Sequence, residues 1–312
     1  MKEYDVLIIG AGIFGRVIGR YLKRQGRDVT LFDAGFEQAG SKPAACLMKP
    51  SWLTSMSKVE QAQSMAVLDE CYGVHEIEAF IQAVAGMGKR STIWWVAPGS
   101  IFSTTKPDNV VKQEVTVVDW EEDYGVPYAR TIEKSESLHG DALRTQCHAA
   151  KLLVVATGSW CNDILPDYLK VTGLRAQLGA AFTWPCDPNR ESRVSVRPWA
   201  PYKQLVSLPN RYPGELWVGD GTAVFDLTAK RLDDSKQRCA RFVHMQELDE
   251  PTQRLVAIEP TVLVGRRPYI RGLGAPAYVQ EVKPGLWIAT GGAKNGTAGA
   301  AWAAHKIASA TN

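Results

Sequence analysis

Residues 4–33, YDVLIIGAGIFGRVIGRYLKRQGRDVTLFD, constrain the fold of this chain more than any other stretch. A short apolar strand leads into the pattern G-x-G-x-x-G at residues 10–15. A helical pattern follows and ends near Gly26, then a second strand covers residues 29–32 and the acidic residue Asp33 closes it. This order predicts a β-α-β unit that binds a dinucleotide, and hence an α/β fold with a parallel sheet.

The three glycines and the acid each have a separate chemical reason. Gly10 permits the tight turn, Gly12 lets a diphosphate approach the backbone, and Gly15 lets helix and strand pack closely. The helix N-terminus attracts the diphosphate, and Asp33 can accept hydrogen bonds from a ribose. The unit by itself is compatible with a nicotinamide dinucleotide or a flavin dinucleotide.

Composition excludes several other classes of protein. The 312 residues, 45% of them hydrophobic, fit one large or two ordinary globular domains. A formal charge of +3 neither demands nor excludes a polyanionic partner. The six cysteines form no C-x-x-C pair, so neither a metal site nor a disulfide framework is indicated. Without a secretory signal or an apolar run of about 20 residues, we expect a soluble, cytoplasmic protein.

Two later stretches favour the flavin. AKLLVVATGSW, residues 150–160, reads as a buried strand that ends in a Thr157-Gly158 turn. GLWIATGGAKNGTAGAAWAAHKIA, residues 285–308, reads as a strand, a glycine turn and a helix of small residues. The start of that helix could stabilise negative charge on the pyrimidine edge of a reduced flavin. The helix could also simply pack close to the sheet, and both roles are compatible because they use different faces.

These segments resemble the D-amino-acid oxidase superfamily of FAD enzymes, and most of all its glycine oxidase and sarcosine oxidase branch. The resemblance covers the N-terminal unit, the loop GSKPAACLMKPSW at residues 40–52, the ATG segment, and GRRPYI at residues 265–270 with GGAKNG at residues 291–296. The middle of the chain matches only loosely.

The resemblance implies a Rossmann-like FAD-binding domain built from residues 1–50, 128–172 and 262–312. Residues 51–127 and 173–261 would form an α+β substrate domain on an antiparallel sheet. We expect the alternating segments EVTVVDW and GELWVGDG to be strands of that sheet, with the helical pattern at residues 58–72 on or beside it.

The resemblance also implies two candidate catalytic residues. Arg267 takes the place of the arginine that receives the substrate carboxylate, and a one-residue alignment shift would give this role to Arg266. Lys294 takes the place of the basic residue before Asn-Gly, where it would meet the flavin or the substrate carboxylate, unless it is only an exposed loop lysine. The candidate cofactor-binding residues are Gly10, Gly12, Ile13, Phe14, Gly15, Asp33, Ala34, Ala44, Ala45, Cys46, Ala156, Thr157, Gly158, Trp160, Gly292, Lys294, Asn295, Gly296 and Thr297.

The implied cofactor is non-covalent FAD, because the late glycine segment lacks the cysteine that links flavin in sarcosine oxidases; Cys46 is expected to be a small packing residue. The implied reaction is oxidation of a glycine-like or N-substituted glycine amine. A hydride passes to the flavin, the imine hydrolyses, and O₂ restores the flavin with release of hydrogen peroxide. The protein side chains would mainly bind and orient, so no histidine is assigned a role.

One alternative substrate is an N-glycyl or carboxymethylaminomethyl group on a modified nucleobase in DNA or RNA. The chain is shorter than expected for a member of this family. The missing length would fall in the substrate domain and could leave a more open substrate site. Basic and aromatic residues also alternate over residues 190–212, a pattern that suits phosphate contacts and base stacking but equally a solvated surface with core tryptophans. A nicotinamide dehydrogenase and a flavin-binding protein without turnover are less favoured.

Overall fold

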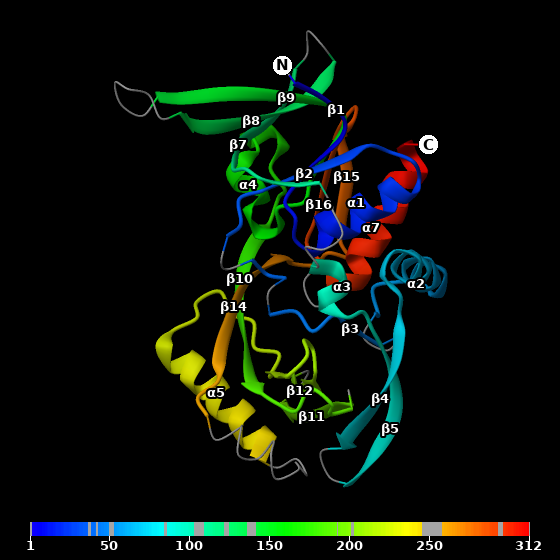
Figure 1. Cartoon of the computed structure of the whole chain (residues 1–312), viewed down its shortest axis with the longest axis vertical. Coiled ribbons are helices and arrows are strands. Elements are labelled where there is room, and N and C mark those ends of the chain that lie inside the picture. Colours follow the sequence, from blue (N-terminus) through cyan, green and yellow to red (C-terminus); the bar gives the residue numbers. More distant parts are fainter. Residues whose placement is uncertain are drawn as a thin grey trace.

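The computed structural model forms two mixed sheets that stand end to end along the long axis of the molecule (Figure 1). Each sheet has eight strands within the described part of the chain. The described residues are 2–36, 39–41, 43–49, 53–83, 86–102, 109–121, 125–135, 142–191, 193–200, 203–244, 258–292 and 296–311.

The first sheet has a parallel centre with strand order β15-β16-β9-β1-β2-β6, and β8 joins β7 to β9 at one end. Its strands are β1 (Lys2–Ile9), β2 (Val29–Asp33), β6 (Val110–Lys112), β7 (Val115–Glu121), β8 (Val126–Ser135), β9 (Ala142–Val155), β15 (Tyr278–Lys283) and β16 (Leu286–Thr290). This is the predicted Rossmann-like arrangement with a parallel sheet, and the mixed α/β fold class is confirmed.

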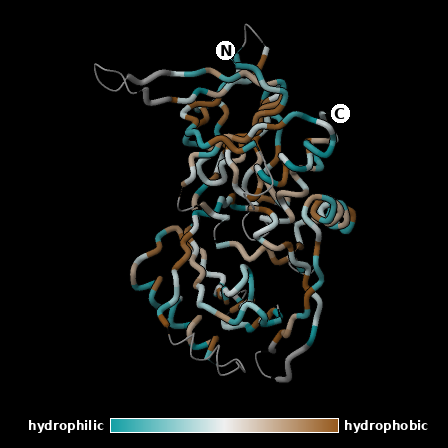
Figure 2. Tube along the Cα trace, in the orientation of Figure 1, coloured by the Kyte–Doolittle hydropathy of each residue, from teal (hydrophilic) through white to brown (hydrophobic). Residues whose placement is uncertain are grey.

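The apolar runs in the sequence are explained by burial on both faces of this sheet. Val6, Leu7 and Ile8 are each fully buried, as parallel strands covered on both sides require. One face packs against α1 (Ile13–Arg24) and α7 (Gly296–Thr311), which also contact each other. In Figure 2, hydrophobic segments run through the centre of this half of the molecule.

The second sheet is mainly antiparallel, with strand order β14-β10-β13-β12-β11-β4-β5-β3. Its strands are β3 (Leu47–Met48), β4 (His75–Ala83), β5 (Gly86–Trp95), β10 (Leu174–Pro185), β11 (Val194–Ala200), β12 (Lys203–Pro209), β13 (Glu215–Gly219) and β14 (Thr261–Ile270). Helix α5 (Ala229–His244) packs against β10, β12 and β13. The predicted strand GELWVGDG therefore lies in this sheet as β13.

The remaining helices are short apart from α2. They are α2 (Lys58–Tyr72), α3 (Pro98–Phe102), the 3-10 turn η2 (Gly158–Trp160), α4 (Cys161–Ile164) and the 3-10 turn η3 (Asp167–Leu169). Within the described ranges, no helix combines the length and the apolar character needed to cross a membrane.

Helix α2 has the predicted bounds but a different neighbour. Ser57 and Glu60 form a capping box that fixes its start. We expected the helix beside the second sheet, whereas it packs on α7 and α1, and Trp302 Nε1 donates to Glu60 Oε1 at 3.1 Å. Its weak segregation of polar and apolar residues gave no sign of which surface it would cover.

Sheet membership also differs from the predicted segments at two places. EVTVVDW is a strand, β7, but it pairs with β8 in the first sheet rather than with the second. Strand β14 was grouped with the FAD-binding segments from residue 262, yet it pairs with β10 along the second sheet. Alternation of apolar residues indicates a strand but not its partner. The division into two domains stays a prediction.

Candidate functional site

A cavity of about 620 Å³ opens at the carboxyl ends of β1, β2 and β9, between the two sheets. Most of the predicted site residues line it. They are Gly10, Gly12, Ile13, Phe14, Asp33, Ala34, Ala44, Ala45, Cys46, Ala156, Thr157, Gly158, Trp160, Arg267, Gly292, Gly296 and Thr297. Ligands of doubly wound folds bind at this end of the strands.

Of the predicted residues that the structure describes, one does not line the cavity. Gly15 lies below it, where helix α1 meets β1: an added Cβ would stand 1.8 Å from the carbonyl oxygen of Gly10. Gly15 therefore allows helix α1 and strand β1 to pack closely, as the sequence pattern predicted. Lys294 and Asn295 lie outside the described residues.

The glycine turn after β1 is held by backbone contacts. Gly10 has φ +100°, and a Cβ there would lie 2.7 Å from the carbonyl oxygen of Ala156 at the end of β9. Any other residue would separate the two strands that form the floor of the cavity. Gly12 instead meets only the hydroxyl of Ser41, at 3.2 Å, so its missing side chain leaves space on the cavity side.

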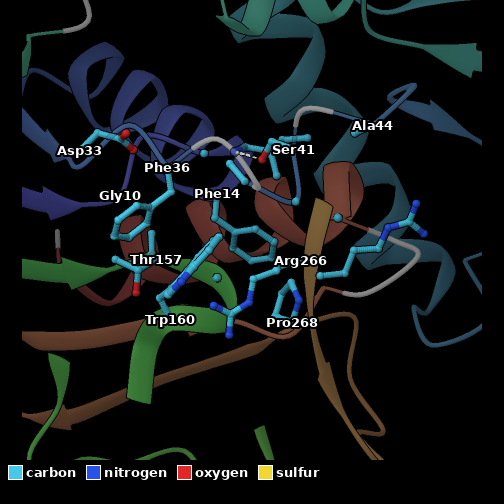
Figure 3. A pocket seen from close by; sticks show the side chains of 18 of the residues that line it. Gly10, Phe14, Asp33, Phe36, Ser41, Ala44, Thr157, Trp160, Arg266 and Pro268 are labelled. Carbon is cyan, nitrogen blue, oxygen red and sulfur yellow. Dashed lines mark hydrogen bonds between the residues drawn. The ribbon is translucent and has the colours of Figure 1, made fainter. Parts of the chain in front are cut away.

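The Asp33 carboxylate is fixed at the cavity wall by two backbone donors. The N–H of Ala11 donates to Oδ2, and the N–H of Gly35 donates to Oδ1 at 2.6 Å. These bonds hold the acid beside the glycine turn (Figure 3). A carboxylate has further lone pairs, which can accept hydrogen bonds from ribose hydroxyls.

Two helices begin at the same cavity. Gly12 is the N-cap of α1 and has no side chain to shield the helix start, while Gly296 and Thr297 bring the start of α7 to the wall. The N–H of Ile13 donates to Ser41 Oγ at 2.9 Å, so a hydroxyl stands at the first helix start. Two positive helix ends suit a group with negative charge at two places, such as a diphosphate and an electron-rich ring.

The loop after β2 crosses the cavity with small side chains. Ala44, Ala45 and Cys46 all line it. Cys46 adopts φ +55°, and burial raises the pKa of its thiol to about 11, against an opposing hydrogen bond with Thr297. The thiol is therefore a neutral, poorly nucleophilic group at neutral pH, in line with its predicted packing role.

The neighbouring arginines of β14 have different surroundings. The guanidinium of Arg266 lies 4.6 Å from the ring centre of Trp160, on the side of the first sheet (Figure 3). Arg267 instead packs against β10, where an added Cβ on Gly179 would lie 3.0 Å from its Cζ and 2.9 Å from the carbonyl oxygen of Thr222. Both arginines line the cavity, but they differ in what they contact: Arg266 lies on Trp160, and Arg267 lies against Gly179 of β10.

The charge of Arg267 is poorly solvated. Enclosure by protein lowers the pKa of its guanidinium, and the nearby charge of Asp220 opposes that shift. Arginine keeps its proton under these conditions, so the half-buried cation favours an anionic partner that reaches it through the cavity.

Several lining residues were missed in the sequence. Gln113, Glu114, Val115 and Thr116 follow the parallel strand β6, and Ser41, Trp217 and Val206 come from a loop and from the second sheet. The position after a strand that pairs with β2 was the available signal for the first group. Trp217 and Val206 carried no local signal, because antiparallel pairing brings them to the cavity from separate strands.

The glycine turn, the anchored acid and the two helix starts define a protein that binds a dinucleotide at the carboxyl end of a parallel sheet. The chain belongs to the DAO family of FAD-dependent oxidoreductases, whose family model matches residues 5–138 and 109–310. FAD is therefore its cofactor. A search of curated protein sequences found no match.

Solved structures share the fold over nearly the whole chain. Glycine oxidase from Geobacillus kaustophilus aligns with a TM-score of 0.66 and 16% identity, covering 99% of this chain and 94% of that one. Iminodiacetate oxidase from Chelativorans sp. BNC1 gives 0.65 and 17%, covering 97% and 94%. Glycerol-3-phosphate dehydrogenase from Bacillus halodurans, complexed with FAD, gives 0.61 and 15%, covering 99% and 64%. At these identities the likeness establishes the fold.

Proposed function

We propose that this protein oxidises glycine-like or N-substituted glycine amines, with O₂ as the electron acceptor. The observation that carries the proposal is the enclosed Arg267 guanidinium, which lies against the second sheet and lines the same cavity as the glycine turn. A guanidinium binds a carboxylate through two parallel hydrogen bonds and so fixes the adjoining α carbon.

The remaining chemistry divides between cofactor and protein. When bound, FAD supplies the oxidising power by accepting a hydride. The protein binds the carboxylate through Arg267, and Trp217 and Val206 close the second-sheet side of the cavity against water. Among the described lining residues, the carboxylates are Asp33, Glu114 and Asp163, all from segments that belong to or follow strands of the first sheet. We therefore propose that the amine enters in its neutral form.

Two further parts of the proposal concern the cofactor. The first is that FAD is held without a covalent bond, since Cys46 is a buried neutral thiol. Acid precipitation should then release all the flavin, and flavin that stays on the denatured chain would contradict this part. The second is that Lys294 meets the flavin or the substrate carboxylate, as the family resemblance implies.

The direct test of the reaction is anaerobic mixing with glycine, sarcosine and larger N-substituted glycines. The proposal expects bleaching of the flavin absorbance without NAD(P)H, and hydrogen peroxide once air is admitted. Reduction by NAD(P)H alone would assign the protein to the reductases or dehydrogenases.

The test of the carboxylate site compares Arg267→Ala with Arg266→Ala. Loss of the enclosed guanidinium should raise the substrate concentration for half-maximal flavin reduction roughly 100-fold, because a charged partner is removed from a shielded site. FAD should remain bound. Arg266→Ala is the matched control, since its guanidinium lies on Trp160. A large effect of Arg266→Ala with normal Arg267→Ala would place the carboxylate at the other arginine.

The nucleobase-borne substrate is the less favoured alternative. Arg193 pairs with Glu78 at 2.9 Å, and the buried Arg211 lies 3.6 Å from Glu215, so these arginines of the basic segment already face acids. The chain also spans 94% of the glycine oxidase it resembles, which weakens the argument from a shortened substrate domain.

Salt dependence separates the two substrates. Flavin reduction by an oligonucleotide with an N-glycyl group would weaken steeply with salt, because phosphate contacts compete with counterions. We expect reduction by the free amino acid to depend little on salt. Fast reduction by the oligonucleotide, with little by glycine at equal concentration, would reverse the proposal.

A further inference from the structure

Two tryptophans of the second sheet donate hydrogen bonds to the loop that crosses the cofactor cavity. Trp95, at the end of β5, donates from Nε1 to the carbonyl oxygen of Ala45 at 3.1 Å. Trp217, in β13, donates from Nε1 to the carbonyl oxygen of Pro43 at 3.0 Å. Both indoles are buried, with 9% and 8% of their surface exposed.

These bonds hold the loop at Pro43 and Ala45. Between the two accepting carbonyls stands Ala44, and immediately beyond them is Cys46 with its left-handed backbone. The Cys46 carbonyl accepts from Val96 N–H at 3.3 Å, which brings the chain into pairing with β5. On the opposite side the loop presses on β14, since a Cβ on Gly265 would lie 2.7 Å from Pro43 Cγ.

We propose that Trp95 and Trp217 are positioning residues that fix the cavity-lining loop at residues 43–46. Trp217 also forms part of the cavity wall, whereas Trp95 acts only through the Ala45 carbonyl. The second sheet therefore controls the surroundings of the cofactor as well as those of the substrate.

The physical reason is the cost of an unpaired buried carbonyl. A buried acceptor that loses its donor loses its hydrogen bond without regaining water, unless the chain moves. The small side chains of the loop offer little packing to resist such a movement. Removing either indole N–H should therefore displace the loop toward water or into the cavity.

The chain offers a matched control in Trp287. This tryptophan of β16 is 4% exposed, and its Nε1 has no hydrogen-bond partner among the described residues. Trp287→Phe thus removes the same ring volume as Trp95→Phe or Trp217→Phe but breaks no hydrogen bond. Differences between these variants report the indole N–H rather than the loss of a buried ring.

The experiment measures FAD binding and the visible flavin spectrum of the three variants, together with the melting temperature of each apoprotein. Trp95→Phe and Trp217→Phe should weaken FAD binding about ten-fold and shift the flavin bands. Trp287→Phe should keep the wild-type dissociation constant and spectrum even if its melting temperature falls as far. Wild-type spectrum and affinity in Trp95→Phe, or an equal loss in Trp287→Phe, would overturn the proposal.

A second measurement needs no variant of the loop contacts. In wild-type protein, hydrogen exchange at the indole Nε1 of Trp95 and Trp217 should slow when FAD is added, because the cofactor braces the loop from the other side. Exchange at Trp287 should change little. Equal exchange with and without FAD at Trp95 and Trp217 would contradict the inference. No substrate enters either measurement, so the result is independent of whether the protein oxidises glycine.

Discussion

The two walls of the cofactor cavity are built by different means. On the side of the first sheet, the wall includes glycines, backbone N–H groups and two helix starts, which lie in a few short segments of the sequence. On the side of the second sheet, the wall is built from individual side chains, among them Val206, Trp217 and Arg267 from three separate strands.

Because of this difference, substrate specificity can change without a change in cofactor binding. A diphosphate is recognised by backbone geometry, which tolerates few substitutions because an added Cβ meets main chain. Side chains on antiparallel strands can be exchanged without altering the sheet, so the substrate can vary while the cofactor stays the same.

The largest expected effect, on both folding and FAD binding, comes from a glycine behind the first-sheet wall. Gly15→Ala should abolish FAD binding and unfold most of the protein at room temperature, because its Cβ would lie 1.8 Å from backbone at Gly10. Gly12→Ala is the control: its Cβ meets only Ser41 Oγ at 3.2 Å, so the apoprotein should keep its melting temperature and lose only FAD affinity. Equal melting temperatures for both variants would remove the distinction between packing and ligand space.

A smaller effect, on the free energy of unfolding, is expected for a carboxylate of the second sheet. The fully buried Asp220 accepts from Thr222 and from Arg238 Nη2, at 2.8 Å. Asp220→Asn should cost about 3 kcal/mol of unfolding free energy, because it leaves the charge of Arg238 uncompensated. The control Asp167→Asn breaks an exposed pair with Lys170 and should change the urea midpoint little.

The Asp220 carboxylate should also make the free energy of unfolding fall at acid pH. Burial raises the pKa of Asp220, but hydrogen bonds from Thr222 and Arg238 outweigh it and the net shift is downward. A lowered folded-state pKa gives stability that is complete above the unfolded value of about 3.9 and is lost as pH falls toward the folded value. Urea unfolding from pH 6 to pH 3 should show this loss in the wild type and a shallower one in Asp220→Asn.

A still smaller effect is expected for Gly179→Ala, which should weaken substrate binding alone. In Gly179→Ala the added Cβ would lie 3.0 Å from Arg267 Cζ and 2.9 Å from the Thr222 carbonyl, so the guanidinium must shift. KM for the amine should rise about ten-fold while FAD affinity is unchanged, since shifted charged contacts weaken by this order. Gly274→Ala has open space and serves as control. An unchanged KM would show that Arg267 does not meet the carboxylate.

The smallest effect concerns a single thiol. Burial raises the pKa of Cys46 to about 11, so at pH 8 it should be alkylated far more slowly than the half-buried Cys147. Mass spectrometry of timed iodoacetamide reactions measures both rates. Fast labelling of Cys46 in the apoprotein would show that the loop opens in the absence of FAD.

The sequence by itself determined the strands β1, β2, β9 and β16 of the first sheet, the glycine turn and the acid at the end of β2. These depend on contiguous patterns in which each glycine and each apolar run has one physical reason. It also determined that helix α2 spans residues 58–72, because the capping box is local.

Only the tertiary structure decided which sheet β7 and β14 join, that α2 packs on α7, and that Trp217 and Val206 reach the cavity. It also separated Arg266 from Arg267, because adjacent residues of a strand point to opposite faces and the sequence does not say which face meets Trp160. Such choices depend on pairing between segments distant in sequence. The contacts that stabilise these arrangements join residues far apart in the chain, so no local sequence pattern predicts them.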